Sequence, residues 1–199
     1  FAMARGHKRD GHDLHALEMT KWFDTNYHYL VPELQAGQRF ALNGDKPLAE
    51  FREAQAQGHR ARPVLLGPVS FLLLSKTVDG SDRLALLDAL LLPYIELLGR
   101  MADAGVDWVQ LDEPCLVPDL DDDDRTAYRR AYETLAAART PRLLLATYFG
   151  ALDGNLALAA SLPVAGLHVD LVRGPAQQDA VLGALPGERV VSGGVVDGQ

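Results

Sequence analysis

The stretch Val106–Pro114, VDWVQLDEP, decides the fold, because an apolar β-type run leads directly into two carboxylates and a proline. Similar runs recur along the chain and alternate with helical patterns. Such alternation, with strands that are apolar on nearly every residue, predicts a parallel sheet covered by helices. The predicted strands are Tyr27–Val31, Arg62–Leu66, Val106–Leu111, Leu143–Tyr148, Gly166–Leu171 and Arg189–Val191.

Helix signals lie between these strands. Pro47 opens the first helix, with Leu48, Phe51 and Ala54 on one face. Four carboxylates at Asp121–Asp124 favour a helix start over a calcium loop, because a helix N-terminus attracts negative charge and the ligand spacing of a calcium loop is missing. The other predicted helices are 82–104, 155–161 and 177–185, and the first 16 residues are predicted to form a loop.

The fold class that follows is α/β. A closed eightfold barrel typically needs about 250 residues, more than this chain has. We therefore predict an incomplete (β/α)8 TIM-type barrel with about six of eight parallel strands and covering helices, although a doubly wound sheet fits the same pattern. Residues 1–199 are predicted to form a single domain. Because the chain opens at Phe1 and stops just past an apolar run, we expect an internal fragment with two uncovered strand edges.

Composition excludes several classes of protein. With 48% hydrophobic residues the chain is too apolar for a disordered protein. A formal charge of −8 provides no basic field, so neither nucleic acid nor a membrane surface is an expected partner. The single cysteine, Cys115, excludes an internal disulfide and any zinc site that needs two thiolates from this chain. We expect a cytoplasmic protein without a membrane span.

Polar residues at predicted strand ends are the first candidates for function, because ligands bind there in α/β folds. Asp112 and Glu113 are adjacent, so alternation sends them to opposite sides of the strand and prevents them from facing each other as an acid-base pair. Either residue binds a substrate amine or accepts hydrogen bonds from loop amides. His168 and Asp170 share one face, either as a ligand or proton-transfer pair or as two groups that satisfy each other.

Several familiar sites are missing from the sequence. No dinucleotide fingerprint, phosphate-binding loop or nucleophile elbow is present. His7, His12 and His15 lie in a polar setting that favours solvated side chains over a metal site. Cys115 has no flanking base, so we interpret it as a small buried apolar residue.

The segment Met19–Glu33, MTKWFDTNYHYLVPE, places a lysine among aromatic side chains. Composition alone favours an amphipathic turn whose aromatic rings fill a core. The segment nevertheless resembles the N-terminal signature of the cobalamin-independent methionine synthase family. Further stretches are similar to that family in the same order: Pro63–Phe71, Trp108–Pro114, Thr147–Phe149 and Gly166–Leu171.

This resemblance implies an enzyme that moves a methyl group from 5-methyltetrahydropteroyltriglutamate to homocysteine, without cobalamin, using two barrels placed face to face. It implies that Lys21 contacts the folate substrate with its polyglutamate tail. It also implies that a zinc ion activates the homocysteine thiol, and that the zinc ligands and catalytic residues belong to a C-terminal barrel missing here. We therefore expect no catalytic residue and no metal or other cofactor in this chain, a partner in the missing barrel, and no activity of the chain alone.

Two alternatives stay open. A self-contained barrel of the uroporphyrinogen-decarboxylase type needs arginines at strand ends, but Arg62 precedes its strand and Arg173 follows another. A non-catalytic folate-binding module would use the aromatic residues as its ligand face, namely Trp22, Phe23, Tyr27 and Tyr29.

Overall fold

A computed structural model describes residues 2–9 and 11–197, and its centre is a five-stranded parallel sheet. The strand order is β11-β10-β9-β8-β6, so each of these strands pairs with its neighbour in sequence and the order never reverses. A doubly wound sheet contains such a reversal, whereas a βα barrel does not. The five strands are β6 (Val64–Leu66), β8 (Trp108–Asp112), β9 (Arg142–Ala146), β10 (Gly166–Asp170) and β11 (Val190–Gly194).

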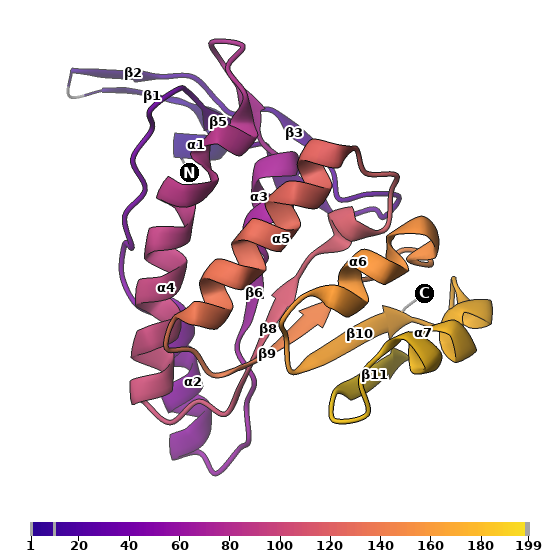
Figure 1. The fold of residues 1–199 in the computed structure, drawn as a ribbon. Helices are drawn as coiled ribbons and strands as arrows, with labels where there is room; N and C mark the ends of the chain where they lie inside the picture. Colours follow the sequence, from indigo (N-terminus) through magenta and orange to yellow (C-terminus); the bar gives the residue numbers. More distant parts are fainter. Residues whose placement is uncertain (1, 10, 198–199) are drawn as a thin grey trace.

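Helices follow the strands and cover one face of the sheet, with α4, α5 and α6 in front of it in Figure 1. The α-helices are α1 (Ala2–Arg5), α2 (Lys46–Ala56), α3 (Pro68–Leu73), α4 (Leu87–Asp103), α5 (Asp122–Ala137), α6 (Leu156–Ser161) and α7 (Gln178–Ala184). Short 3₁₀ turns lead directly into three of the helices: η1 (Arg83–Leu86) into α4, η3 (Asp153–Asn155) into α6 and η4 (Pro175–Gln177) into α7. A fourth turn, η2 (Pro114–Leu116), follows β8.

Three smaller two-stranded sheets complete the described chain. Two are antiparallel hairpins, β1 (His7–Arg9) with β2 (His12–Leu14) and β3 (Met19–Lys21) with β4 (His28–Leu30). The third pairs β5 (Glu33–Leu34) with β7 (Lys76–Thr77) in parallel.

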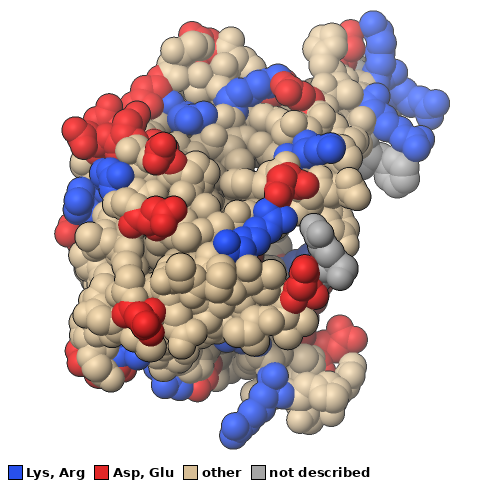
Figure 2. All heavy atoms as spheres, turned by 90° about the vertical axis from the view of Figure 1, so that its right-hand side faces the viewer, with Lys and Arg blue, Asp and Glu red and all other residues tan. Residues whose placement is uncertain are grey.

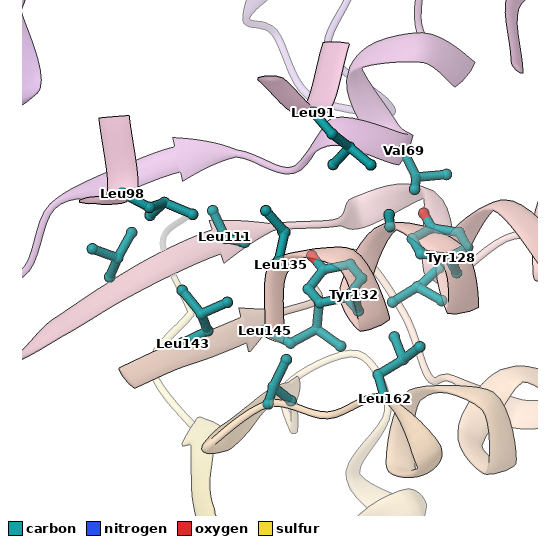
Figure 3. Packing of buried hydrophobic residues seen from close by; sticks show 14 of the residues in the cluster. Val69, Leu91, Leu98, Leu111, Tyr128, Tyr132, Leu135, Leu143, Leu145 and Leu162 are labelled. Carbon is teal, nitrogen blue, oxygen red and sulfur yellow. The ribbon is translucent and has the colours of Figure 1, made fainter. Parts of the chain in front are cut away.

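One hydrophobic core lies between the sheet and its helices. Alternate strand residues such as Leu111 and Leu145 point into it and meet fully buried helix residues such as Leu98 and Tyr132 (Figure 3). Each fully buried side chain of this size contributes roughly 1.5–3 kcal/mol of transfer free energy. The opposite face of the sheet carries the intervening residues, including Gln110, and these lie outside this core.

Most predicted elements are confirmed with small shifts. Helix α2 has Pro47 in its first turn and buries Leu48 and Phe51. Helix α5 begins after Asp121 in a capping box with Asp124, which confirms the helix start over the calcium loop. The predicted helix 82–104 is divided into η1 and α4, and the two later helices correspond to α6 and α7.

Two expectations were wrong, and one helix was missed. The strand predicted at 27–31 exists as β4 but pairs antiparallel with β3, so the parallel sheet of the described chain has five strands rather than six. The first 16 residues hold α1 and the β1–β2 hairpin rather than a loop alone, while Phe1 and Asp10 lie outside the described residues. Helix α3 was missed because six residues show too little periodicity.

A buried carboxylate joins the carboxyl end of β8 to two helices. Glu113 is 0% exposed. Its oxygens accept hydrogen bonds from the amides of Val69 (3.3 Å) and Ser70 (2.7 Å) in α3, and from the hydroxyls of Tyr128 (3.3 Å) and Tyr132 (3.1 Å) in α5. A side chain at Gly67 would displace this group, since a Cβ built there lies 2.1 Å from Glu113 Oε1 and 2.5 Å from Cγ.

Gly67→Ala should therefore destabilise the chain by about 2–3 kcal/mol, because the hydrogen-bonded Glu113 side chain cannot move aside. Urea unfolding followed by circular dichroism measures the loss. The matched control is Gly99→Ala inside α4, where the nearest atom to the new Cβ is 3.8 Å away. The control should gain roughly 0.5–1 kcal/mol from its higher helix propensity. Equal effects of the two changes would contradict the close approach at Gly67.

Candidate functional site

The carboxyl ends of the parallel strands border a cavity of about 730 Å³. Its lining comes from three places: the loop between β3 and β4, the loop after β9, and the ends of β10 and β11. The lining includes the polar and aromatic residues Asp24, Tyr148, Phe149, His168, Asp170 and Arg173. In α/β proteins this edge of the sheet is the usual position of the ligand site.

The β3–β4 hairpin contains the sequence segment singled out above. Trp22 N donates to the Tyr27 carbonyl (2.7 Å), and Thr25 Oγ1 donates to the Trp22 carbonyl (2.7 Å), which closes a tight loop. Phe23 within this loop has φ +53, a left-handed conformation that costs free energy for a residue with a Cβ. Asp24 lies next to it in the loop.

Contacts hold this hairpin at its base and at its tip. At the base, Tyr29 OH donates to the Leu74 carbonyl (3.1 Å), and Lys76 Nζ lies 3.1 Å from Glu18 Oε2. At the tip, Asp24 forms an ion pair with Arg173. This guanidinium lowers the pKa of the Asp24 carboxyl below its ordinary value, chiefly through the hydrogen bond.

Aromatic rings fill the space between the hairpin tip and the loop after β9. The Phe23 and Phe149 ring centroids lie 5.1 Å apart, and those of Tyr148 and Phe149 lie 4.7 Å apart. Trp22 joins the group with centroid distances of 5.3 Å to Phe23 and 5.5 Å to Tyr29. The interpretation of an amphipathic turn whose rings fill a core is therefore wrong about the core: the rings are half-buried and pack on one another outside it, and Tyr27 is exposed.

Lys21 is exposed at the end of β3, where it pairs across the hairpin with His28. It does not line the 730 Å³ cavity itself, whose wall begins three residues later at Asp24. Lys21 and the cavity-lining Asp24 belong to the same hairpin, three residues apart in sequence. A lysine ammonium on an exposed strand end provides a mobile point charge for an anionic ligand.

Asp112 lies on the sheet face opposite the helices and belongs to a row of hydrogen-bonded side chains. Arg62 Nη2 donates to Gln110 Oε1 (2.8 Å), Gln110 Nε2 donates to Asp112 Oδ1 (2.7 Å), and Tyr148 OH donates to Asp112 Oδ2 (3.2 Å). Burial raises the pKa of the Asp112 carboxyl, and the hydrogen bonds from Gln110 and Tyr148 oppose that rise. The row makes Asp112 an acceptor that is already satisfied on both oxygens.

His168 and Asp170 share one face of β10, as predicted, but each has other partners. His168 Nδ1 lies 2.8 Å from Ser192 Oγ. Asp170 Oδ1 accepts the amides of Val172 and Arg173, each at 2.9 Å, and Oδ2 accepts the amide of Phe149 (3.0 Å). The prediction that the two side chains satisfy each other is therefore wrong for their hydrogen bonds. Burial and the positive charge of Arg62 lower the pKa of His168.

Glu113 faces the helices while Asp112 faces away from them, which confirms that the two carboxylates cannot act on one ligand together. Glu113 accepts hydrogen bonds as one of the two alternatives expected, but its donors are amides of α3 and tyrosine hydroxyls of α5 rather than loop amides. Burial raises the pKa of its carboxyl to about 7, an effect larger than that of the donors around it. Glu113 is inaccessible to a substrate, so its role is structural.

The remaining candidates lie apart or are buried. Arg62 lies at the amino end of β6 and Arg173 follows β10, so the two arginines do not converge as a decarboxylase of the uroporphyrinogen type would require. Cys115 is buried, and burial raises the pKa of its thiol to about 12, so it behaves as an apolar residue. A second cavity, of about 980 Å³, lies at the amino ends of the strands and is lined by Trp108 and Arg142.

Residues 2–9 and 11–197 contain neither a cluster of metal ligands nor a helix that could span a membrane. That part of the chain holds no group of three histidine, cysteine or acidic side chains placed to bind a metal ion, and the His12 side chain lies outside the description. Its helices include none that is long and apolar enough to cross a bilayer. Figure 2 shows both signs of charge interspersed over one face, with basic side chains densest on a projection at the upper right.

Sequence reasoning missed the residues that hold the hairpin in place. Phe149 was noted only as the last residue of the Thr147–Phe149 stretch that resembles the family. Arg173 was noted only as an arginine that does not fit a uroporphyrinogen-decarboxylase site. The partner of Arg173 is 149 residues away in sequence, so no local pattern indicates it. The position of Gln110 could have been predicted, because alternation along Trp108–Asp112 places its side chain on the same face of the strand as Asp112.

Comparison with known proteins gives one consistent result. A family model described as the N-terminal domain of cobalamin-independent synthase matches residues 1–199. A 5-methyltetrahydropteroyltriglutamate–homocysteine methyltransferase of Xylella fastidiosa (strain 9a5c) is 63% identical over 199 residues, covering 100% of this chain and 26% of the relative. A protein of the same name from Chelativorans sp. (strain BNC1) is 59% identical over 208 residues, 100% of this chain and 27% of the relative.

The chain thus spans about a quarter of the length of these curated relatives. Among solved structures, a methyltransferase from Methanosarcina mazei matches with a TM-score of 0.51 and 18% identity, over 69% of this chain and 44% of the other. At that identity the match supports the fold alone.

The raised pKa of Glu113 predicts a pH-dependent stability. The folded pKa of about 7 lies above the ordinary 4.5, so the folded state binds more protons between these values, and the contribution of Glu113 to stability falls as pH rises through this window. Relative to Glu113→Gln, the wild-type chain should lose on the order of 2–4 kcal/mol between pH 4.5 and 7 in urea unfolding.

The exposed Glu133→Gln on α5 is the matched control and should follow the wild type at every pH. A stability difference between wild type and Glu113→Gln that does not change with pH would show that the four donors keep Glu113 ionised.

Proposed function

The chain belongs to the cobalamin-independent synthase family, as its N-terminal domain, and from this we propose that it is part of an enzyme that methylates homocysteine with 5-methyltetrahydropteroyltriglutamate. The names of the relatives support this activity. The remaining three quarters of the parent protein would carry the chemistry. The alternatives of a uroporphyrinogen-decarboxylase-like barrel and of a free-standing folate-binding module gain no support from any relative reported above.

The observation that carries the proposal is the position of the β3–β4 hairpin. It brings the MTKWFDTNYHY segment to the carboxyl edge of a parallel sheet, where βα proteins bind their ligands. Lys21 is exposed there, and we assign it to the anionic polyglutamate tail of the folate donor. Asp112 and His168 are weaker candidates, because hydrogen bonds already engage both Asp112 oxygens and one His168 nitrogen.

We further propose that the five-stranded sheet is part of a (β/α)8 barrel and that residues 1–199 are a single domain within it. The unreversed strand order and the one-sided helix layer support this. Strands β6 and β11 end the described sheet, so strands from the rest of the parent would pair with their outer edges. The proposed location is the cytoplasm, which agrees with a single, unpaired cysteine.

A zinc ion that activates the homocysteine thiol would belong to the remainder of the parent protein. The described residues do not fit such an ion, since they hold no group of three suitable ligands and the chain has one cysteine. What this chain contributes is a binding surface for the methyl donor and a scaffold that faces the second barrel. No step of the methyl transfer is assigned to its side chains.

Methyl transfer should require both parts of the protein. The chain alone, supplied with zinc, folate donor and homocysteine, is expected to form no methionine, because the residues of the transfer step lie elsewhere. Mixing it with the missing remainder should restore turnover, measured as methionine by mass spectrometry. Methionine formed by the chain alone would overturn the assignment of the chemistry to the remainder.

Lys21→Ala in the full-length parent should raise the KM for the triglutamate folate about tenfold and leave the KM for homocysteine nearly unchanged, since it removes one charge-assisted contact to the donor only. Steady-state kinetics with each substrate varied in turn measures both constants. Lys46→Ala is the control, because Lys46 is exposed on α2 and its ion pair, at 3.6 Å, is with Glu50 of the same helix. An equal rise in both constants would exclude the tail contact.

A further inference from the structure

The tip of the β3–β4 hairpin is held by residues from two other loops. Arg173, after β10, forms the ion pair with Asp24, and its guanidinium carbon lies 5.5 Å from the centroid of the Phe149 ring. One planar cation thus contacts both a carboxylate and an aromatic face. A lysine cannot reproduce this, because its ammonium is a compact point charge without a planar surface.

Phe149 has a constrained backbone as well as an aromatic contact. Its φ of +76 is left-handed, as is the φ of +53 at Phe23, whose ring it meets. Such conformations persist where surrounding contacts fix them. The Phe149 amide donates to Asp170 Oδ2, and the Arg173 amide donates to Asp170 Oδ1, so one carboxylate aligns both loops against the hairpin tip.

These contacts also separate two cavities. Asp24, Phe149 and Arg173 line both the cavity of about 730 Å³ and a smaller one of about 310 Å³ that extends to Val117 and Pro118. The three side chains therefore form the wall between the cavities. Opening the ion pair would remove part of this wall and leave the hairpin tip held by the ring contact between Phe23 and Phe149.

We propose that Arg173 and Phe149 are positioning residues for the methyl donor: they hold the hairpin so that Lys21 is presented at the carboxyl edge of the sheet. This rests on the proposed function, in which Lys21 contacts the folate tail. Neither residue needs to touch the donor. Asp170 accepts hydrogen bonds from the backbone amides of both residues, and Asp24 is the hairpin residue that pairs with Arg173.

The test uses the full-length parent enzyme with the triglutamate folate and homocysteine as varied substrates. Arg173→Gln should raise the KM for the folate about three- to fivefold while kcat and the KM for homocysteine stay within twofold. Asp24→Asn should give the same rise, because it removes the other half of the ion pair. Arg130→Gln is the matched control, since Arg130 forms an exposed ion pair with Asp88 on the outer helices.

A double substitution separates positioning from direct binding. Because Arg173 acts through Lys21, Arg173→Gln should add little to the KM of a Lys21→Ala enzyme. Additive effects, together with an unchanged KM in Asp24→Asn, would mean that Arg173 binds the anionic tail itself and would overturn the proposal. A general loss of folding would lower the apparent kcat and leave both Michaelis constants unchanged, because the enzyme that stays folded binds normally; an unchanged KM for the folate would also overturn the proposal.

The tail contact of Lys21 and the positioning role of Arg173 predict different kinetic results. If Lys21→Ala leaves the KM for folate unchanged, the proposed tail contact is wrong and the positioning role falls with it. If Lys21→Ala raises that KM but Arg173→Gln and Asp24→Asn do not, the tail contact stands and only the positioning role is wrong.

Discussion

The arrangement of sheet and helices depends on the buried carboxylate of Glu113. It binds the first amides of α3 and two tyrosine hydroxyls of α5, so one side chain at the end of β8 fixes both helices against the sheet. The same strand geometry turns Asp112 to the opposite face, where it joins Gln110 and Tyr148. The two adjacent acidic residues therefore lie in different environments. Glu113 is buried between the sheet and its helices, whereas Asp112 faces the interior of the proposed barrel.

Three loops from distant parts of the chain form the candidate site, and none forms it alone. The hairpin supplies Lys21 and the ring of Phe23, the loop after β9 supplies Phe149, and the loop after β10 supplies Arg173. The sheet sets the spacing of the last two because β9 and β10 are paired neighbours. A rigid parallel sheet with variable loops at its carboxyl edge is the usual way in which βα proteins build a binding surface.

Sequence patterns predicted the parallel strands and most helices because apolar periodicity and helix-start signals are local. They failed for β4, whose apolar residues look like those of a sheet strand although Tyr29 and Leu30 pair within a hairpin. For the site, the opposite orientations of Asp112 and Glu113 followed from alternation. Alternation could not predict the partner of His168, because Ser192 lies beside His168 only through the pairing of β10 with β11. The Asp24–Arg173 pair was equally invisible for lack of any local signal.

The separation of 149 residues between Asp24 and Arg173 has a consequence for the order of assembly. Each strand of the sheet pairs with its sequence neighbour, so the sheet is able to grow in the direction of synthesis. The hairpin is made before the loop after β10, so the ion pair at its tip cannot form until that loop has been translated. The hairpin that carries Lys21 is therefore translated well before the residue that completes its attachment, and it acquires its final position only afterwards.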